Sequence, residues 1–306
     1  MYLRVLNSLL IVQRLTIFQF QSKILEILLS RSKGRVIKMT KVYRQVFFME
    51  LRNLLTYRAD FWINFFGQTF FSLVVAYYLW LSVFEYTGSQ SMQGYTLQGI
   101  IFYYLMAPLI SRIQQGQGIG FAAREIYDGQ LNKYLLYPLN YFGYKFAAYF
   151  AYSSFYIGQL FLILFLYNLF FYDPSVYQFS LAGIFLFLIA MTLACVLFFF
   201  LFSLTEFLAF WFDNTWSLGV ILRFGTSFFG GGLIPLKFFP DWALEILEFT
   251  PFPYLIDFPL KALNLDLTVM EFSKSFSISL VWTLFFVFAS LKLWNKGQYK
   301  YTGVGI

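Results

Sequence analysis

The chain has 306 residues, of which 59% are hydrophobic and 12% are charged, and its formal net charge is +7. Soluble domains carry roughly 25% charged residues, so this composition predicts an integral membrane protein. The chain has no histidine and one cysteine, Cys195, which excludes Ser-His and Cys-His nucleophiles, His-containing zinc sites and intrachain disulfides. Because Cys195 lies inside an apolar run, we interpret it as a packing residue.

Residues 1–38 mix apolar clusters with Arg and Lys, and they lack the compact apolar core and cleavage site of a secretory signal. We interpret them as an N-terminal extension. Because Met39-Thr-Lys is typical of a natural start, we hypothesise that this extension is a misassigned or dispensable leader. Residues 39–60 follow as an interfacial segment, in which residues 41–58 have the periodicity of an amphipathic helix. Such a helix lies on a membrane with its basic face toward anionic lipid headgroups; the alternative is a solvated surface helix.

Residues 61–306 are expected to form one transmembrane domain. Uncharged runs at 61–84, 86–111, 146–172 and 174–205 each exceed the roughly 20 residues that a helix needs to cross a bilayer. The short alternating segments of a transmembrane barrel are absent, so the runs are predicted to be helices and the fold class is all-α. The sequence predicts a polytopic membrane protein with six transmembrane helices, at 61–84, 95–113, 146–171, 179–210, 215–235 and 275–294.

Positive charge is distributed unevenly along the chain. Most Lys and Arg lie before residue 61, between residues 112 and 145, and in the C-terminal tail, whereas the loops after Phe84 and Tyr172 contain none. By the positive-inside rule, both termini and the middle basic region are cytoplasmic, which requires an even number of crossings. The net charge therefore indicates membrane topology and not nucleic acid binding. We expect a multi-pass protein of a plasma membrane or bacterial inner membrane.

A short polar segment, residues 124–139, separates two of the apolar runs. We expect a helix that ends near Asp128, because Gly129 can take the left-handed conformation that commonly follows a helix. The apolar face is predicted to consist of Leu131, Tyr134 and Leu135. The residues predicted to face outward are polar or charged: Arg124, Glu125, Asp128, Asn132 and Lys133. Such a segment presents polar groups to a docking protein; the alternative is an ordinary solvated loop.

Two ionisable residues lie within predicted spans, Glu206 near the end of the fourth and Arg223 within the fifth. The sequence Asp213-Asn214-Thr215 predicts a helix start between them, which puts both at the same depth. A lone charge in lipid costs about 3 kcal/mol or more. We therefore predict an intramembrane ion pair between Glu206 and Arg223; the alternative is a role in transport.

Residues 230–259 interrupt the helical pattern, because they contain five of the chain's eight prolines. No continuous helix tolerates that density of proline. A piece such as Asp241–Phe249 is too short to cross a bilayer, so we expect broken re-entrant helices in the outer leaflet between spans five and six. The residues that define this outer re-entrant segment are Gly231, Gly232, Pro235, Pro240, Pro251 and Pro253.

Several motifs, taken in order, resemble those of a known family. They are Tyr57-Arg-Ala-Asp-Phe-Trp62 before the first span, Ile-x-x-Gly-x-Leu-Asn-x-x-Leu-x-x-Pro from Ile126 to Pro138, Gly-Gly-Leu-Ile-Pro-Leu with Phe-Pro-Asp-Trp, and Gly303-Val-Gly305. From residue 41 to residue 306 the chain resembles the permease subunits of ABC-2-type ATP-binding cassette exporters. The first 38 residues depart from that pattern.

The resemblance implies a permease that pairs with a second copy of itself or with a related permease, and that binds a separate ATP-binding subunit. ATP and Mg are expected on that subunit, so this chain is expected to be no enzyme and to hold no catalytic residue, cofactor or metal. Residues 121–137 are implied to couple ATP hydrolysis to helix movement, and the outer broken helices to close the exit. The implied coupling residues are Arg124, Glu125, Tyr127, Asp128, Gly129, Leu131 and Lys133. The implied cargo is lipidic or amphiphilic.

Two other classes of membrane protein are alternatives. A membrane-embedded lipid-modifying transferase needs clustered carboxylates or a histidine at the interface, and the sequence shows neither. An ion-coupled secondary transporter usually has inverted repeats and several midplane charges, but the chain shows no repeat and two such charges. The sequence also has no P-loop, and Gly116, Gly118 and Gly120 lack the spacing and the preceding strand of a dinucleotide-binding loop.

Overall fold

The computed structural model describes residues 35–56, 58–116, 121–136, 140–171, 173, 176–177 and 180–303. Within these ranges the chain forms helices and no β-strand, apart from one isolated β-bridge between Met92 and Tyr95. The all-α fold is therefore confirmed for the described residues. Most of the predicted N-terminal extension, residues 1–34, lies outside them, as do Tyr57, Gly118, Gly120, Pro138, Tyr172 and Gly305.

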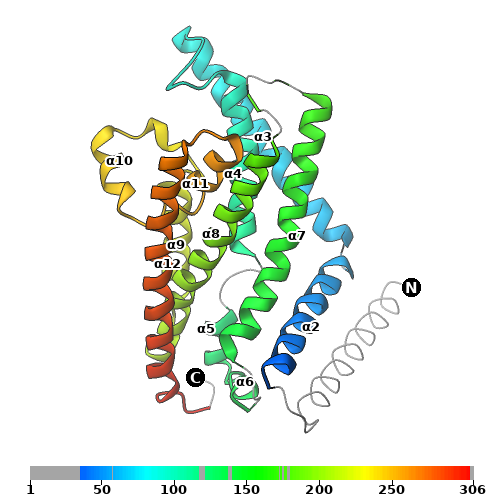
Figure 1. Ribbon diagram of the computed structural model, residues 1–306, viewed down its shortest axis with the longest axis vertical. Coiled ribbons are helices and arrows are strands. Elements are labelled where there is room, and N and C mark those ends of the chain that lie inside the picture. The colour runs from blue at the N-terminus through cyan, green and yellow to red at the C-terminus, as the bar shows by residue number, and fades with distance from the viewer. Residues whose placement is uncertain are drawn as a thin grey trace.

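The helices form an elongated bundle (Figure 1). In chain order they are α2 (Arg35–Thr56), α3 (Arg58–Thr87), α4 (Leu97–Gln115), α5 (Phe121–Tyr127), α6 (Asn132–Leu136), α7 (Tyr141–Phe170), α8 (Leu181–Phe207), the 3-10 helix η1 (Leu208–Phe210), α9 (Trp216–Phe229), the 3-10 helix η2 (Leu236–Phe238), α10 (Asp241–Glu248), α11 (Asp257–Asn264) and α12 (Val269–Gln298). One end of the bundle holds α5, α6 and the end of α12, and the other holds α10 and α11.

Helix α8 is the centre of the bundle. Its sequence is apolar around its whole circumference, which is typical of a buried helix, and it packs against α4, α5, α9, α11 and α12. Phe187, Met191 and Cys195 of α8 are buried in the main core together with Met106 and Ile110 of α4. Cys195 is a free, buried cysteine, as the sequence predicts.

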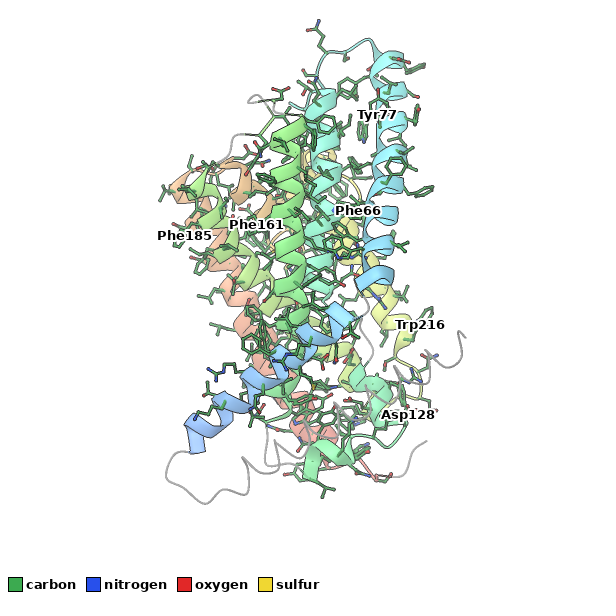
Figure 2. The ribbon with its side chains drawn as sticks, turned by 90° about the vertical axis from the view of Figure 1, so that its right-hand side faces the viewer. Phe66, Tyr77, Asp128, Phe161, Phe185 and Trp216 are labelled. Carbon is green, nitrogen blue, oxygen red and sulfur yellow. The ribbon has the colours of Figure 1, made fainter. Side chains whose placement is uncertain are left out.

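Four described helices are long and apolar enough to cross a membrane: Phe65–Thr87, Tyr141–Phe170, Leu181–Phe210 and Val269–Gln298. Side chains such as Phe66 on α3 and Phe185 on α8 are exposed apolar groups on the outside of the bundle (Figure 2). These exposed faces fit a lipid environment, in which apolar groups need no protein cover.

Helices α4 and α9 occupy the places of predicted spans two and five, but α9 is shorter than predicted. Helix α4 has 19 residues and contains Pro108, and α9 has 14 residues. At 1.5 Å per residue α9 is about 21 Å long, less than the roughly 30 Å of a bilayer core. It ends at Phe229, before the predicted end at residue 235, because the backbone turns at Gly231, where φ is +88°. The count of six spans therefore stays a prediction.

Helix α2 matches the predicted amphipathic segment and lies along α7. Val42 and Val46 are buried against Tyr144, Ala147 and Ala148 of α7. The Tyr43 hydroxyl accepts a hydrogen bond from the Asn140 backbone N at 3.3 Å, at the start of α7. Among the described residues, these contacts hold α2 against α7.

The proline-rich segment folds as short helices, as the sequence predicts. Pro240 immediately precedes α10 at its N-cap, and α10 closely matches the expected piece from 241 to 249. Tyr103 of α4 donates a hydrogen bond to the Gly231 carbonyl at 2.5 Å, and Trp282 of α12 donates one to the Phe249 carbonyl at 3.2 Å. Lys274 of α12 also forms an ion pair with Glu248. The location of this segment in the outer leaflet stays a prediction.

Candidate functional site

The polar segment between α4 and α7 folds into two short helices joined by a tight turn. We call residues 121–136 the α5–α6 segment. Gly129 has a φ of +69°, as predicted for the residue that ends a helix. The turn is closed by hydrogen bonds from the Gly129 backbone N to the Ile126 carbonyl at 3.3 Å and from the Leu131 backbone N to the Glu125 carbonyl at 3.0 Å. Pro138, the last residue of the motif, lies outside the described residues.

The inner side of the α5–α6 segment is apolar and has its own core. Leu131 is fully buried, as predicted, and Ala122, Ala123 and Ile126 are buried beside it. The core is completed by aromatic residues of α7, α8, η1 and α12, chiefly Tyr141, Phe142, Phe207, Phe210 and Trp294. This cluster is separate from the main core of the bundle, so the segment has its own hydrophobic support.

Leu135 lies outside that core, which corrects the sequence prediction. Its side chain is 45% exposed, although Leu131 and Tyr134 face inward as predicted. Helix α6 begins only at Asn132, after the turn, and is a single turn long. Consequently the helical periodicity of the residues before Gly129 does not extend to the last residues of α6.

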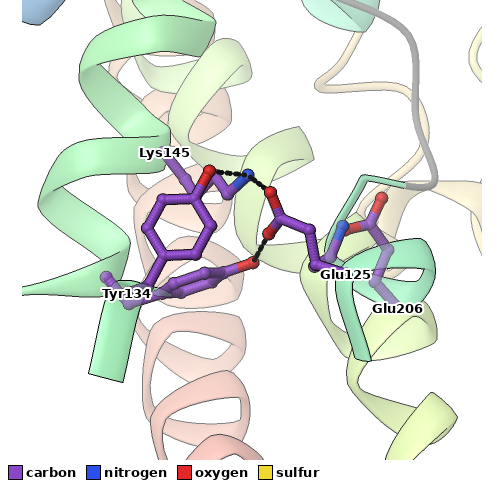
Figure 3. A network of polar contacts seen from close by, with 6 residues as sticks. Glu125, Tyr134, Lys145 and Glu206 are labelled. Carbon is purple, nitrogen blue, oxygen red and sulfur yellow. Dashed lines mark hydrogen bonds and ion pairs between the residues drawn. The ribbon is translucent and has the colours of Figure 1, made fainter. Parts of the chain in front are cut away.

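Glu125 is buried, so the prediction that it faces outward is wrong. It is 8% exposed, because it lies three residues after Ala122 on the same inner helical face. Its carboxylate accepts a hydrogen bond from the Lys145 Nζ at 2.6 Å and another from the Tyr141 hydroxyl at 3.1 Å (Figure 3). Lys145 also lies 3.5 Å from the Tyr134 hydroxyl. This network joins α5 and α6 to the first turns of α7.

The aromatic rings around Lys145 add to this network. The Lys145 Nζ lies 4.8 Å from the centre of the Tyr134 ring and 5.6 Å from that of Tyr141, which is within the range of cation–π attraction. Burial, and then the neighbouring Glu125 carboxylate, raise the pKa of the Tyr134 hydroxyl above its usual range. Tyr134 therefore stays neutral beside the ion pair.

Other contacts join the α5–α6 segment to the ends of the longer helices. The Tyr127 hydroxyl donates to the Phe212 carbonyl at 3.0 Å and accepts from the Thr215 backbone N at 3.1 Å, which fixes it to the turn between α8 and α9. The Asn132 side chain donates to the Gly303 carbonyl at 3.1 Å, after the end of α12. Hydrogen bonds therefore join this segment to the start of α9 and to the residues after α12.

The outer side of the segment is exposed and mixed in character. Arg124 and Asp128 form an ion pair of 3.4 Å, and their side chains are 81% and 43% exposed. Asn132 and Lys133 are exposed beside them, as predicted. Leu136, 83% exposed, adds an apolar group to this polar surface. Figure 2 shows Asp128 at this end of the bundle. We call these residues, with Leu135, the outer face of the segment.

Glu206 and Arg223 line one cavity of about 250 Å³ between α5, α8 and α9. The ion pairs found among the described residues do not include this one, and the predicted pair stays a prediction. Glu206 Oε2 accepts a hydrogen bond from the Ala122 backbone N at 3.1 Å, and the Arg223 guanidinium lies 6.0 Å from the centre of the Phe202 ring. The predicted helix start is confirmed, because the Trp216 backbone N donates to the Asn214 side chain at 3.0 Å.

Sequence reasoning missed the partners that hold the segment, above all Lys145, Tyr141 and Trp294. The rings of Tyr141 and Trp294 are stacked 4.3 Å apart, although the two residues are distant in the chain. Lys145 did carry a signal, since it is a cation in the first turns of an otherwise uncharged helix. Such a charge needs a partner, but the sequence does not show which one.

A comparison with protein families gives a match over most of the chain. A family described as "ABC-2 family transporter protein" matches residues 70–305. The matched range contains the α5–α6 segment, the proline-rich segment and α12, whereas α2 precedes it. Neither the curated proteins nor the solved structures contain a match.

Proposed function

The chain belongs to the ABC-2 family of transporter proteins, and from this membership we propose that it is the membrane-spanning permease subunit of an ATP-binding cassette transporter. ATP and Mg are held by a separate ATP-binding subunit, which hydrolyses the ATP. The long apolar helices support the membrane part of this proposal. The cargo proposed is lipidic or amphiphilic and is moved outward, as in the ABC-2-type exporters that the chain resembles.

The outer face of the α5–α6 segment is the proposed docking surface for the ATP-binding subunit. The observation that carries this assignment is the division of the segment into two sides. Its outer side exposes Arg124, Asp128 and Lys133, while its inner side is fixed by Leu131 and by the Glu125–Lys145 pair. A rigid element with an exposed charged side suits a docking surface, since a partner then binds it without a large cost in ordering.

Movement passes from this surface to the spans through the contacts of the inner side. Tyr127 connects the segment to the start of α9, and Asn132 connects it to the residues after α12. Glu125 connects it to α7 through Lys145. We assign to these three links the coupling of ATP hydrolysis to rearrangement of the helices.

The proposed topology has six spans, with both termini and the α5–α6 segment in the cytoplasm. Helices α4 and α9 supply spans two and five, and the segment from η2 to α11 forms the re-entrant helices on the outer side. The protein pairs with a second copy of itself or with a related permease. It resides in a plasma membrane or bacterial inner membrane, in contact with its lipids.

Co-purification tests the proposed function. The full chain carries a tag and is expressed with an ATP-binding cassette ATPase of the same organism, and the ATPase is expected to co-purify. Reversing both outer charges, Arg124→Glu with Asp128→Arg, is expected to abolish co-purification, and the apparent melting temperature of the chain is expected to change little. The matched control reverses Glu245, which is exposed at the other end of the bundle. An ATPase that binds the reversed variant as tightly as the wild type contradicts the docking assignment.

A further inference from the structure

From Ser279 to its end, helix α12 has one buried face and one exposed face. The buried face runs from Ser279 through Phe286 to Trp294, on a helix that packs along α8. The exposed face begins with large apolar side chains, among them Val281 and Phe288, which are 66% and 67% exposed. Apolar groups without protein cover fit contact with lipid chains. This exposed face is therefore the lipid-facing side of α12.

The character of the exposed face changes at Lys292. From this residue on, the side chains at the same helical spacing are no longer aliphatic: Lys292, Asn295, Lys296 and Tyr299 are all exposed, and Lys300 is exposed beside them. Tyr299 is 93% exposed. We call these five residues the basic end of α12. A lipid-facing side that becomes basic at one end indicates the level at which lipid headgroups lie.

The length of α12 agrees with this level. The helix has 30 residues, so at 1.5 Å per residue it is about 45 Å long, whereas a bilayer core is about 30 Å thick. The predicted span, residues 275–294, fills that core, and Lys296 then lies about 3 Å beyond its edge. Each headgroup layer is about 5–7 Å thick. Lys296 is therefore at the depth of the lipid phosphates.

The basic end has no acidic partner among the described residues. The sequence contains no Asp or Glu after Glu271, and the ion pairs of the described residues do not include Lys292, Lys296 or Lys300. The Lys292 Nζ lies 5.9 Å from the centre of the Phe288 ring, one turn earlier on the exposed face. Clustered cations at a membrane surface attract anionic lipid headgroups. The two outer lysines, Lys296 and Lys300, are therefore available to a headgroup.

We propose that the basic end of α12 binds an anionic phospholipid. The ammonium groups of Lys296 and Lys300 contact the phosphate, Tyr299 lies among the headgroups, where membrane proteins are rich in tyrosine, and the acyl chains run along the exposed apolar face of α12. A lipid is favoured over a protein partner because the basic end continues the lipid-facing side of the helix. This inference goes beyond the proposed function and does not depend on the ATP-binding subunit.

The basic end is close to contacts that hold the α5–α6 segment (Figure 1). Trp294 stacks on Tyr141 at 4.3 Å, and the Gly303 carbonyl accepts the hydrogen bond of the Asn132 side chain. Along the chain, most of the basic end lies between these two contacts. A lipid bound there is therefore expected to stabilise the α5–α6 segment.

Native mass spectrometry of the full chain tests the proposal without an ATP-binding subunit. The protein in detergent micelles is equilibrated with phosphatidylglycerol or, separately, with phosphatidylcholine of the same acyl chains, and the dissociation constants are compared. We expect phosphatidylglycerol to bind about tenfold more tightly. The double variant Lys296→Gln with Lys300→Gln is expected to weaken this binding about tenfold, which corresponds to about 1.4 kcal/mol, and so to abolish the preference.

Two control variants make the result specific. Lys296→Arg keeps the positive charge and is expected to bind phosphatidylglycerol as the wild type does. Lys237→Gln removes an exposed charge beside α11, at the other end of the bundle, and is expected to keep the wild-type affinity.

Three outcomes would overturn the proposal. The first is wild-type affinity for phosphatidylglycerol in the double variant, and the second is equal affinity of the wild type for both lipids. The third is loss of ATPase co-purification in the double variant at unchanged lipid affinity, which would assign the basic end to the ATP-binding subunit. Because the lipid measurements do not involve the ATPase, the co-purification test of the proposed function remains independent.

Discussion

Removal of the Glu125 carboxylate is expected to be the most damaging single change in the α5–α6 segment. Glu125→Ala leaves the Lys145 ammonium without the carboxylate that it contacts at 2.6 Å, and the two side chains are only 11% and 18% exposed. Removing one partner of a buried pair typically costs about 3–5 kcal/mol. Because the pair is partly accessible and Glu50 also acts on Lys145, we expect the low end of that range, about 3 kcal/mol.

The chain offers a matched control on the same helix. Arg124 and Asp128 form an ion pair that is 81% and 43% exposed, and exposed pairs contribute about 0–1 kcal/mol. Arg124→Ala is therefore expected to lower the free energy of unfolding by less than about 0.5 kcal/mol. Both substitutions remove a charge, from adjacent positions of α5. The difference between their losses in free energy of unfolding therefore measures how much the burial of the Glu125–Lys145 pair matters.

Unfolding in detergent, followed by tryptophan fluorescence, is the assay. Trp294 stacks on Tyr141, which donates a hydrogen bond to Glu125, so its emission reports on the same cluster. A double-mutant cycle of Glu125→Gln with Lys145→Gln separates the pairwise energy from the other contacts. If Glu125→Ala and Arg124→Ala cost the same within about 0.5 kcal/mol, the reasoning that Glu125 fixes the segment is refuted.

Three other substitutions test separate parts of the structure. Tyr127→Phe removes the hydroxyl that bonds Thr215, so we expect a loss of about 1–2 kcal/mol and weaker stimulation of the ATPase at unchanged affinity for it; wild-type stimulation in nanodiscs would contradict this. In Gly183→Ala the new Cβ would lie 2.6 Å from a backbone carbonyl of α11, and we expect a loss of about 1–3 kcal/mol in SDS unfolding. Gly158→Ala is the control, because a Cβ added there has no atom within 4 Å. An equal loss of stability in Gly158→Ala and Gly183→Ala would contradict this prediction. Burial raises the pKa of the Glu50 carboxyl in the folded state above its ordinary value of 4.5. The folded state therefore binds the proton more tightly than the unfolded state does. The free energy of unfolding of the wild type is expected to fall as the pH rises from 4.5 through the raised pKa. Glu50→Gln removes this pH-dependent contribution to stability. If the melting temperatures of the wild type and of Glu50→Gln change equally across that pH range, Glu50 is not the source of the pH dependence.

The fold was predictable to the extent that it depends on local sequence. Apolar runs longer than a bilayer is thick predict α3, α4, α7 and α8, and periodicity predicts α2. The predicted end of α9, residue 235, lies six residues beyond its observed end at Phe229, since the apolar sequence continues through the glycines at which the backbone turns. Hydropathy records composition, whereas that end depends on backbone conformation.

Within the site, the turn at Gly129 and the exposed Arg124 and Asp128 followed from local pattern. The orientation of Glu125 did not, because it depends on Lys145 and Tyr141, which α7 brings to it from later in the chain. A helical face of seven residues is too short for periodicity to decide which charge is buried. The exposed residues of the proposed docking surface were thus predictable from local sequence. The buried residues that support it were not, because their positions depend on long-range contacts.

Site-specific photo-crosslinking tests the docking assignment most directly. A photoreactive amino acid replaces Lys133 on the outer face, or, as control, Trp242 on α10 at the other end of the bundle; both are exposed. Membranes that contain the co-expressed ATP-binding subunit are then irradiated. A crosslink to that subunit from position 133 and none from position 242 is the predicted result. A crosslink from position 242 alone would contradict the assignment of the α5–α6 segment as the docking surface.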